Sequence, residues 1–230
     1  MSDAAVPEPR SGAIMVKTVA IDGPAGAGKS TLAKLLAKHL GLHRLDTGAM
    51  YRAVAWAALE RNIDPADKET VAELARTLRI DVGDKVYIDG HDATRAIRTA
   101  PVDRAVSIVA ANPGVRTELV RRQRDWVSRH GGGVVEGRDI GTVVLPDADL
   151  KVYLTAAARE RARRRAKERK DEESVAQVEA ELVRRDELDS TRTDSPLQAP
   201  GQAEDAIVVD STNKSAASIL EEVLGCLRAG

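Results

Sequence analysis

The chain has 230 residues, of which 43% are hydrophobic and 31% are charged, and its 35 basic and 36 acidic residues give a net charge of −1. A chain of this length can bury about 70% of the surface that it exposes when unfolded, so a substantial core is expected. The near-neutral charge gives no general attraction to nucleic acid or membranes, and an aromatic content of 2% disfavours base-stacking platforms.

Other compositional features exclude further classes of protein. A single cysteine, Cys226, rules out an intrachain disulfide and a cysteine-ligated metal. No apolar run reaches the length of a transmembrane helix. Residues 1–13 mix Pro, Ala and charged residues and lack an apolar segment, so they predict a disordered tail rather than a signal peptide. We expect a monomer that binds neither membranes nor nucleic acid.

A glycine-rich loop near the N-terminus carries the strongest signal. Residues 23–30 match the P-loop pattern G-x-x-x-x-G-K-[ST], between a predicted strand at 14–21 and a predicted helix with apolar helical spacing. Backbone N–H groups in such a loop point at phosphate oxygens, Lys29 adds a mobile charge, and the Ser30 hydroxyl is a candidate Mg²⁺ ligand. ATP is therefore expected, and with it a cytoplasmic location. Its candidate contacts are Gly23, Pro24, Ala25, Gly26, Ala27, Gly28, Lys29, Ser30 and Thr31.

The first half of the chain continues with short predicted elements. Gly41 ends the first helix, a strand follows at 43–45, and the next helix runs to about residue 62. Asp64-Pro65 predicts the start of another helix, with Asp at the N-cap and Pro at the first position. Alternating apolar residues within 79–89 predict a small hairpin, and a helix is expected at 99–111. We interpret residues 63–106 as an insertion in a nucleotide-binding core.

The second half returns to alternating helices and strands. A helix ends at the glycines 131–133, and strands are expected at 134–135, 150–154 and 207–209. Ser174 and Gln177 form a capping-box pattern, and residues 216–227 predict the last helix. The alternation predicts an α/β fold of P-loop NTPase type, with three α/β/α layers around a parallel five-stranded sheet. The polar motifs after the strands then lie at one edge, where ligands bind in such sheets.

Three polar clusters make a second site plausible at that edge. They are Asp46-Thr47-Gly48-Ala49-Met50-Tyr51-Arg52, Glu136-Gly137-Arg138-Asp139-Ile140-Gly141-Thr142 and the segment from Arg184 to Arg192. In the third cluster, Arg185, Asp189 and Arg192 have i, i+4, i+7 spacing and share one helical face. Each cluster alone could be an ordinary set of surface ion pairs. Together they supply arginines for an acceptor phosphate, with carboxylates and hydroxyls for a sugar and a base.

The same segments carry a resemblance to a known family. The P-loop, residues 45–52, residues 136–148 and Arg185-Asp186-x-x-Asp189-x-x-Arg192 together resemble bacterial cytidylate kinases, from about residue 17 to the C-terminus. The resemblance implies transfer of the γ-phosphoryl group of ATP to CMP or dCMP with Mg²⁺, an inserted nucleoside-monophosphate-binding subdomain at 63–106, and a helical lid at about 157–180. Thr47 stands where many members have Ser, and Ser30 where many have Gly.

Residue roles follow from the resemblance by position. It implies that the CMP phosphate is bound by Arg52, Arg138 and Arg192. It also implies that Thr47, Arg116 and Asp139 lie near the cytosine, and that Ser107, Arg185 and Asp189 lie near the pentose. Asp46 and Tyr51, from the first cluster, are counted with this acceptor site.

A run of basic residues from Arg159 to Lys170 is the candidate lid. Phosphoryl transfer depends on positioning and charge stabilisation, so cations that follow the transferred group are the main requirement. By position, Arg161, Arg164 and Arg165 are the candidate catalytic cations, together with Lys29. A solvated charged helix or an RNA-binding helix would have the same composition.

Rival functions remain open at this stage. Residue chemistry alone predicts a kinase with a small anionic acceptor, which could be UMP, AMP or shikimate; only the resemblance selects cytidine. A P-loop GTPase switch would need an Asn-Lys-x-Asp guanine reader, but the single Asn-Lys pair, Asn213-Lys214, is followed by Ser215-Ala216.

Overall fold

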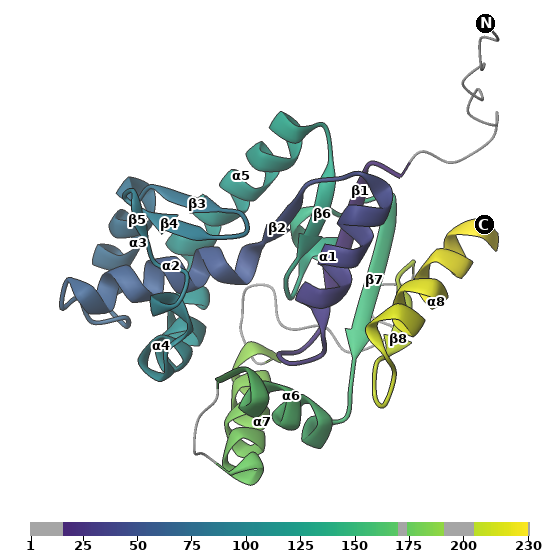
Figure 1. The fold of residues 1–230 in the computed structure, drawn as a ribbon. Helices are drawn as coiled ribbons and strands as arrows, with labels where there is room; N and C mark the ends of the chain where they lie inside the picture. The colour runs from purple at the N-terminus through teal and green to yellow at the C-terminus, as the bar shows by residue number, and fades with distance from the viewer. Residues whose placement is uncertain (1–15, 170–173, 191–204, 230) are drawn as a thin grey trace, which may run out of the picture.

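A central sheet with helices on both sides organises the chain (Figure 1). The computed structural model describes residues 16–169, 174–190 and 205–229. In chain order the elements are β1 (Thr18–Asp22), α1 (Lys29–Leu40), β2 (Arg44–Asp46), α2 (Thr47–Glu60), α3 (Lys68–Thr77), β3 (Ile80–Val82), β4 (Val86–Ile88), β5 (His91–Asp92), η1 (Ala96–Arg98), α4 (Ala100–Ala110), α5 (Pro113–His130), β6 (Gly133–Glu136), η2 (Ile140–Val144), β7 (Leu150–Thr155), α6 (Ala158–Arg169), α7 (Val175–Ser190), β8 (Ile207–Asp210) and α8 (Ala216–Ala229).

The main sheet has five strands in the order β2-β6-β1-β7-β8, and every neighbouring pair is parallel. Strand β1 is central, so the P-loop that follows it emerges between the ends of β6 and β7. The register pairs Ile21 with Glu136 and Asp22 with Tyr153, which brings the carboxyl ends of the three strands level with one another. The predicted parallel five-stranded α/β fold is confirmed.

Successive residues of β1 point to opposite faces and seed two separate cores. Val19 and Ile21 pack in a cluster with residues of α1 and α8. Ala20 lies in the other cluster, with residues of α2, α4 and α5. Both clusters consist of Ala, Val, Leu, Ile and Met side chains, because the chain has no Phe and few other aromatic residues. The helices on the two faces complete three layers around the sheet.

The segment predicted as an insertion, called the inserted unit below, packs beside α2 and α5 and shares one hydrophobic core with them. It contains α3, an antiparallel three-stranded sheet in the order β3-β4-β5, and η1. The predicted hairpin is present as β3 and β4, and β5 adds a third strand. Helix α4 begins here and continues to Ala110, so the boundary that we expected between residues 106 and 107 falls inside a helix.

The predicted helix start at Asp64-Pro65 is wrong. Asp64 instead closes a turn, in which its side chain accepts a hydrogen bond from Ala66 N. Asp67 is the N-cap of α3, and its carboxylate accepts hydrogen bonds from both the backbone N and the hydroxyl of Thr70. Two aspartates three residues apart both fit the N-cap pattern, and the second makes the additional hydroxyl contact.

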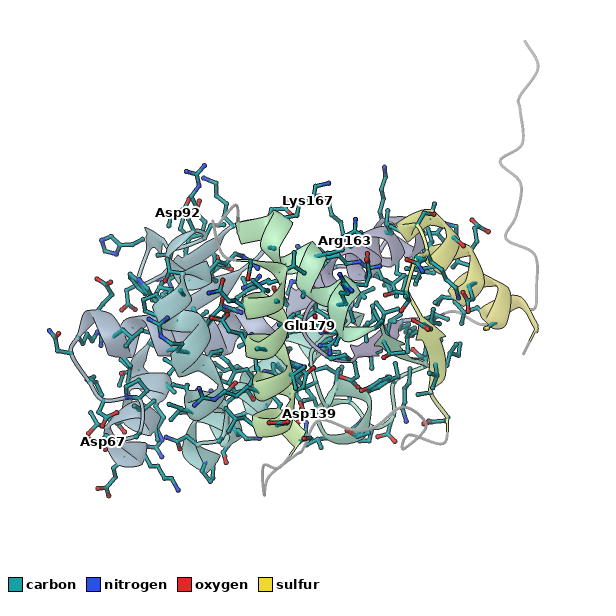
Figure 2. The ribbon with its side chains drawn as sticks, turned by 90° about the horizontal axis from the view of Figure 1, so that it is seen from below. Asp67, Asp92, Asp139, Arg163, Lys167 and Glu179 are labelled. Carbon is teal, nitrogen blue, oxygen red and sulfur yellow. The ribbon has the colours of Figure 1, made fainter. Side chains whose placement is uncertain are left out.

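Helices α6 and α7 pack against each other through Ala162, Val178 and Leu182. The predicted capping box at the start of α7 is present, with Gln177 N bonded to the Ser174 hydroxyl and Ser174 N bonded to Gln177 Oε1. Seen from below, α7 crosses the middle of the molecule between the helices of the inserted unit and α8 (Figure 2). Among residues 16–169, 174–190 and 205–229, no helix combines the length and the apolar composition needed to cross a membrane. The predicted tail at 1–13 and Arg192 lie outside the described residues.

Candidate active site

The loop after β1 wraps tightly around the side chain of Lys29. Gly28 has a left-handed conformation (φ 97°), and α1 begins at the next residue. At Gly23 a Cβ atom would lie 2.0 Å from the carbonyl oxygen of Leu154 in β7, so only glycine fits there. The Lys29 ammonium donates hydrogen bonds to the carbonyl oxygens of Gly23 (2.8 Å) and Pro24 (2.9 Å). Burial, aided by the nearby charge of Arg138, lowers the pKa of Lys29 to about 8.

A hydroxyl and a carboxylate join the P-loop to strand β6. Ser30 Oγ donates a hydrogen bond of 2.7 Å to Glu136 Oε2, and Arg44 Nη1 lies 3.4 Å from Glu136 Oε1. Thr47 Oγ1 donates to the backbone carbonyl of Glu136 at 2.7 Å, which fixes the start of α2 against β6. Burial, together with the negative charge of Asp46, raises the pKa of Glu136 to about 7.

The donor set around Ser30 suits Mg²⁺ held together with a nucleotide. No group of three or more His, Cys, Asp and Glu side chains that could hold a metal ion occurs within the part of the chain that the structure describes. Mg²⁺ commonly takes only one or two protein oxygens and completes its coordination with substrate phosphates and water. Ser30 Oγ and the Glu136 carboxylate, 2.7 Å apart at the mouth of the P-loop, are oxygen donors of that kind.

One cavity of about 470 Å³ joins the P-loop to the polar clusters. Its volume is in the range typical of small-molecule sites. The predicted site residues that line it are Ala25, Gly26, Gly28, Lys29, Ser30, Thr31, Asp46, Thr47, Tyr51, Arg52, Ser107, Arg116, Arg138, Asp139, Arg165, Arg185 and Asp189. The structure therefore brings together residues that are up to 164 positions apart, from Ala25 to Asp189.

An ion pair and a buried carboxylate shape the far wall of this cavity. Arg116 on α5 donates to Asp139 at 2.5 Å, and both side chains are buried. Asp139 precedes η2, whose first N–H groups are bound by the carboxylate of Asp22, at 2.7 Å from Ile140 N and 2.8 Å from Gly141 N. Burial raises the pKa of Asp22 to about 6. The residue that precedes the P-loop thus fixes the turn that carries Asp139.

Several arginines on the lid side are tied to carboxylates. Arg138 contacts Asp189 at 2.9 Å and Asp186 at 3.4 Å, and Arg161 donates to Asp186 at 2.5 Å. Burial, followed by the charges of other arginines, lowers the pKa of Arg185 to about 9. These contacts connect α7 to α6 and to the loop after β6.

Three predicted lid arginines have different positions. Arg161 is buried and donates to the carbonyl oxygen of Ala25 at 3.1 Å, whereas Arg164 donates to Ala27 O (3.3 Å) and to Ser211 Oγ (2.9 Å) and O (2.7 Å). Both brace the P-loop and neither lines the cavity; Arg165 does. Arg163 and Lys167 are exposed on α6, away from Asp139 (Figure 2).

Some residues that line the cavity were given no role from the sequence. Lys34, Arg44, Arg98 and Glu136 line the cavity, and Arg98 lies 3.5 Å from Asp46. Glu136 stood inside a recognised motif, but its burial depends on the pairing of β6 with β1 and β2. Asp103 lies behind the wall in contact with three of the lining arginines, and no sequence pattern marks it.

Several known proteins are similar to this chain over most of its length. The family model described as cytidylate kinase matches residues 19–229. Proteins named cytidylate kinase from Mycobacterium avium and Desulfitobacterium hafniense are 48% and 49% identical, covering 91% and 90% of this chain and 94% and 90% of theirs. The Bacillus subtilis protein of that name is 44% identical over 90% of this chain and 94% of its own.

Solved structures support the fold alone. A gluconokinase from Sinorhizobium meliloti superposes with a TM-score of 0.53 at 12% identity, covering 94% of this chain and 93% of its own. At that identity the likeness carries no information on substrate. The family match over nearly the whole chain, with near-half identity to several members, confirms the predicted resemblance and the predicted class of enzyme, a kinase. The chain belongs to the cytidylate kinase family.

Proposed function

We propose that the protein transfers the γ-phosphoryl group of ATP to CMP or dCMP, giving ADP and CDP or dCDP. The observation that carries the proposal is a cavity that has a P-loop at one end and paired arginines and carboxylates at the other. The P-loop end suits a nucleoside triphosphate, and the other end suits a phosphate attached to a sugar and a base. Family membership selects cytidine among the possible bases.

The reaction needs no general base, because the attacking group is already a phosphate oxyanion. An oxygen of the CMP phosphate forms a bond to the γ-phosphorus while the bond from that phosphorus to the β–γ bridging oxygen breaks, and ADP leaves. Catalysis then consists of holding two anions in line and stabilising the charge that moves between them. Mg²⁺, held with ATP by Ser30 and the Glu136 carboxylate, would neutralise part of the phosphate charge.

The roles of individual residues are part of the proposal. Lys29 leaves the carbonyl oxygens of Gly23 and Pro24 to bind the β- and γ-phosphates. Arg52, Arg138 and Arg192 bind the acceptor phosphate, and Arg165 reaches the transferring group from α6. Arg116 and Asp139, already paired at 2.5 Å, read the cytosine edge together with Thr47, while Ser107, Arg185 and Asp189 hold the pentose.

Two alternatives are weaker on specific grounds. An RNA-binding role would use only part of the positive charge of α6, because Arg161 and Arg164 bind backbone carbonyl oxygens of the P-loop while Arg163 and Lys167 are exposed. A GTPase switch would need an Asn-Lys-x-Asp motif to read guanine, and this sequence does not contain one. A kinase for UMP, AMP or shikimate would share the donor end of the cavity and differ only at the acceptor end.

One assay separates the acceptors. The protein is incubated with ATP and Mg²⁺ and with CMP, dCMP, UMP, AMP, GMP or shikimate in turn, and ADP formation is followed. We expect kcat/KM for CMP or dCMP to exceed that for every other acceptor. If CMP is no better than AMP, GMP or UMP, the proposal fails. The monomeric state and the cytoplasmic location stay predictions, which gel filtration with light scattering and cell fractionation test.

A further inference from the structure

A buried carboxylate on α4 collects arginines from three other helices. Asp103 lies in the first turn of α4, and its side chain is only 8% exposed. Arg165 Nη2 donates to both of its oxygens, at 3.1 and 2.9 Å. Arg52 Nη2 donates to Oδ1, and Arg185 Nη1 lies 3.7 Å from the same oxygen. The three arginines belong to α6, α2 and α7.

The carboxylate lies behind the wall of the cavity, and the arginines form that wall. Arg52, Arg165 and Arg185 all line the cavity, whereas Asp103 does not. A guanidinium group has five N–H donors, and the contacts with Asp103 use only some of them. Because all three arginines line the cavity, their guanidinium groups can also contact a ligand there.

Asp103 also balances charges that would otherwise repel one another. Burial alone would raise the pKa of Asp103, but Arg52, Arg165 and Arg185 hold it well below its usual range. Arg52 is itself a buried cation, with a pKa that burial lowers and that Arg165 lowers further. Among the described residues, Asp103 offsets part of the charge of the three guanidinium groups and Asp189 offsets part of that of Arg185. The remaining excess of positive charge suits a phosphate.

We propose that Asp103 is a positioning residue that holds Arg52 and Arg165 side by side, so that the acceptor-phosphate cation and the lid cation face the cavity in a fixed relation. The inference rests on the proposed function, because one of its tests measures kcat for CMP phosphorylation. Asp103 thereby connects α6 and α7 to α2 through α4. The relative position of Arg165, on the ATP side, and Arg52, on the acceptor side, is thus set by the Asp103 carboxylate, which contacts neither substrate.

The first test is the variant Asp103→Asn, which keeps the shape and removes the charge. We expect kcat for CMP phosphorylation to fall about 10²-fold, the loss typical of misplacement by about an ångström, while KM for ATP changes less than threefold. The matched control is Glu118→Gln on α5. Glu118 also binds two arginines, Arg121 and Arg122, but none of the three lines the cavity, so kcat should stay within twofold of wild type.

A second readout does not require turnover. Without the carboxylate, an added anion can take its place among the arginines and stabilise the fold by mass action. Inorganic phosphate should therefore raise the Tm of Asp103→Asn by more than it raises the Tm of wild type or of Glu118→Gln. An equal rise in all three proteins would overturn the proposal.

A double-mutant cycle covers the case in which Asp103→Asn folds poorly. In Asp103→Asn/Arg165→Gln one charge of each sign is lost, so the excess positive charge returns to its wild-type value. If Asp103 acts through Arg165, the double variant should lose much less in kcat than the product of the two single losses. A loss equal to that product contradicts the proposal.

Failure of the inference and failure of the proposed function can be told apart. If wild type phosphorylates no nucleoside monophosphate, the proposed function fails, and the dependence of Tm on phosphate still tests Asp103. If CMP is phosphorylated and Asp103→Asn retains wild-type kcat, the inference alone is wrong.

Discussion

The hydroxyl of Ser30 lies 2.7 Å from Oε2 of Glu136, so the first turn of α1 is bonded directly to the end of β6. These residues are 106 positions apart in the chain. The contact joins the loop that would hold ATP to the strand that leads into Arg138 and Asp139. Removing the Ser30 hydroxyl therefore tests how strongly the two ends of the cavity depend on each other.

Ser30→Ala should lower kcat/KM for ATP by about 10- to 100-fold. The change removes the proposed Mg²⁺ ligand and takes the Ser30 donor away from the buried Glu136 carboxylate, a loss of about 1–3 kcal/mol. Steady-state kinetics at several Mg²⁺ concentrations would measure the change, with a shift of the half-saturating Mg²⁺ concentration to higher values. Ser30→Thr keeps the hydroxyl and serves as the control. Equal activity in Ser30→Ala and wild type would exclude the role.

The pH dependence of ATP use should report Lys29. Its pKa is about 8, below the usual lysine value of 10.5, because burial and then Arg138 disfavour the charged form. The free enzyme therefore loses the Lys29 charge as the pH rises above about 8, and kcat/KM for ATP should fall about tenfold per pH unit there. The profile of kcat should fall only at higher pH, since bound phosphates favour the protonated amine. Lys29→Arg, always charged, should give a lower but flat profile.

Asp22 should make the stability of the protein depend on pH in an uncommon direction. Its pKa rises from 3.8 to about 6 on folding, so the folded protein binds the proton more tightly than the unfolded chain. This contribution to stability is present below pH 3.8 and is lost as the pH rises towards 6, by up to about 3 kcal/mol. The free energy of unfolding of wild type, minus that of Asp22→Asn, should therefore decrease between pH 4 and 7 in urea titrations. A constant difference would show that Asp22 ionises normally.

Asp139→Ala should relax the preference for cytosine. The substitution removes the carboxylate that pairs with Arg116 at 2.5 Å, and both groups face the part of the cavity assigned to the base. We expect the ratio of kcat/KM for CMP to that for UMP to fall by at least tenfold, about 1.4 kcal/mol of discrimination. The measurement is the ratio, so a general loss of folding cancels. If the ratio is unchanged, the base lies elsewhere.

Arg165 and Arg164 are neighbours in sequence with different expected roles. Arg165 lines the cavity, so Arg165→Ala should lower kcat by about 10³-fold, or 4 kcal/mol, by analogy with arginine fingers. Arg164 binds Ala27 O and Ser211, so Arg164→Ala should lower thermal stability and raise KM for ATP more than it lowers kcat. Kinetics and thermal unfolding of both variants separate the two roles. Equal losses of kcat would mean that α6 rearranges during the reaction.

Local patterns predicted the parts of the fold that local physics determines. The P-loop, the alternation of strands and helices, the hairpin of β3 and β4 and the capping box at Ser174 all depend on residues close together in sequence. The start of α3 was misplaced because Asp64 and Asp67 satisfy the same capping rule. The short π-helix η2 was not foreseen, since it depends on the distant carboxylate of Asp22.

Site residues that belong to a sequence motif could be predicted, whereas those outside a motif could not. Asp103 sits in an ordinary amphipathic helix, and its partners Arg52, Arg165 and Arg185 are 51, 62 and 82 residues away. No spacing rule connects positions so distant. Similarly, composition predicted that α6 is basic, but the packing of α6 on α7 decides which of its arginines reach the cavity.

The order of strands in the sheet sets a length scale for the chemistry. The P-loop leaves β1 and the Arg138–Asp139 turn leaves β6, and these strands are hydrogen-bonded neighbours. Parallel neighbours lie about 4.8 Å apart, a spacing that backbone hydrogen bonds maintain without help from any side chain. The spacing of β1 and β6 thus fixes the separation between the P-loop and the Arg138–Asp139 turn. In the proposed reaction, substitutions in α6 or α7 change how well charge and water are controlled, whereas the distance that the phosphoryl group crosses is set by the backbone of the sheet.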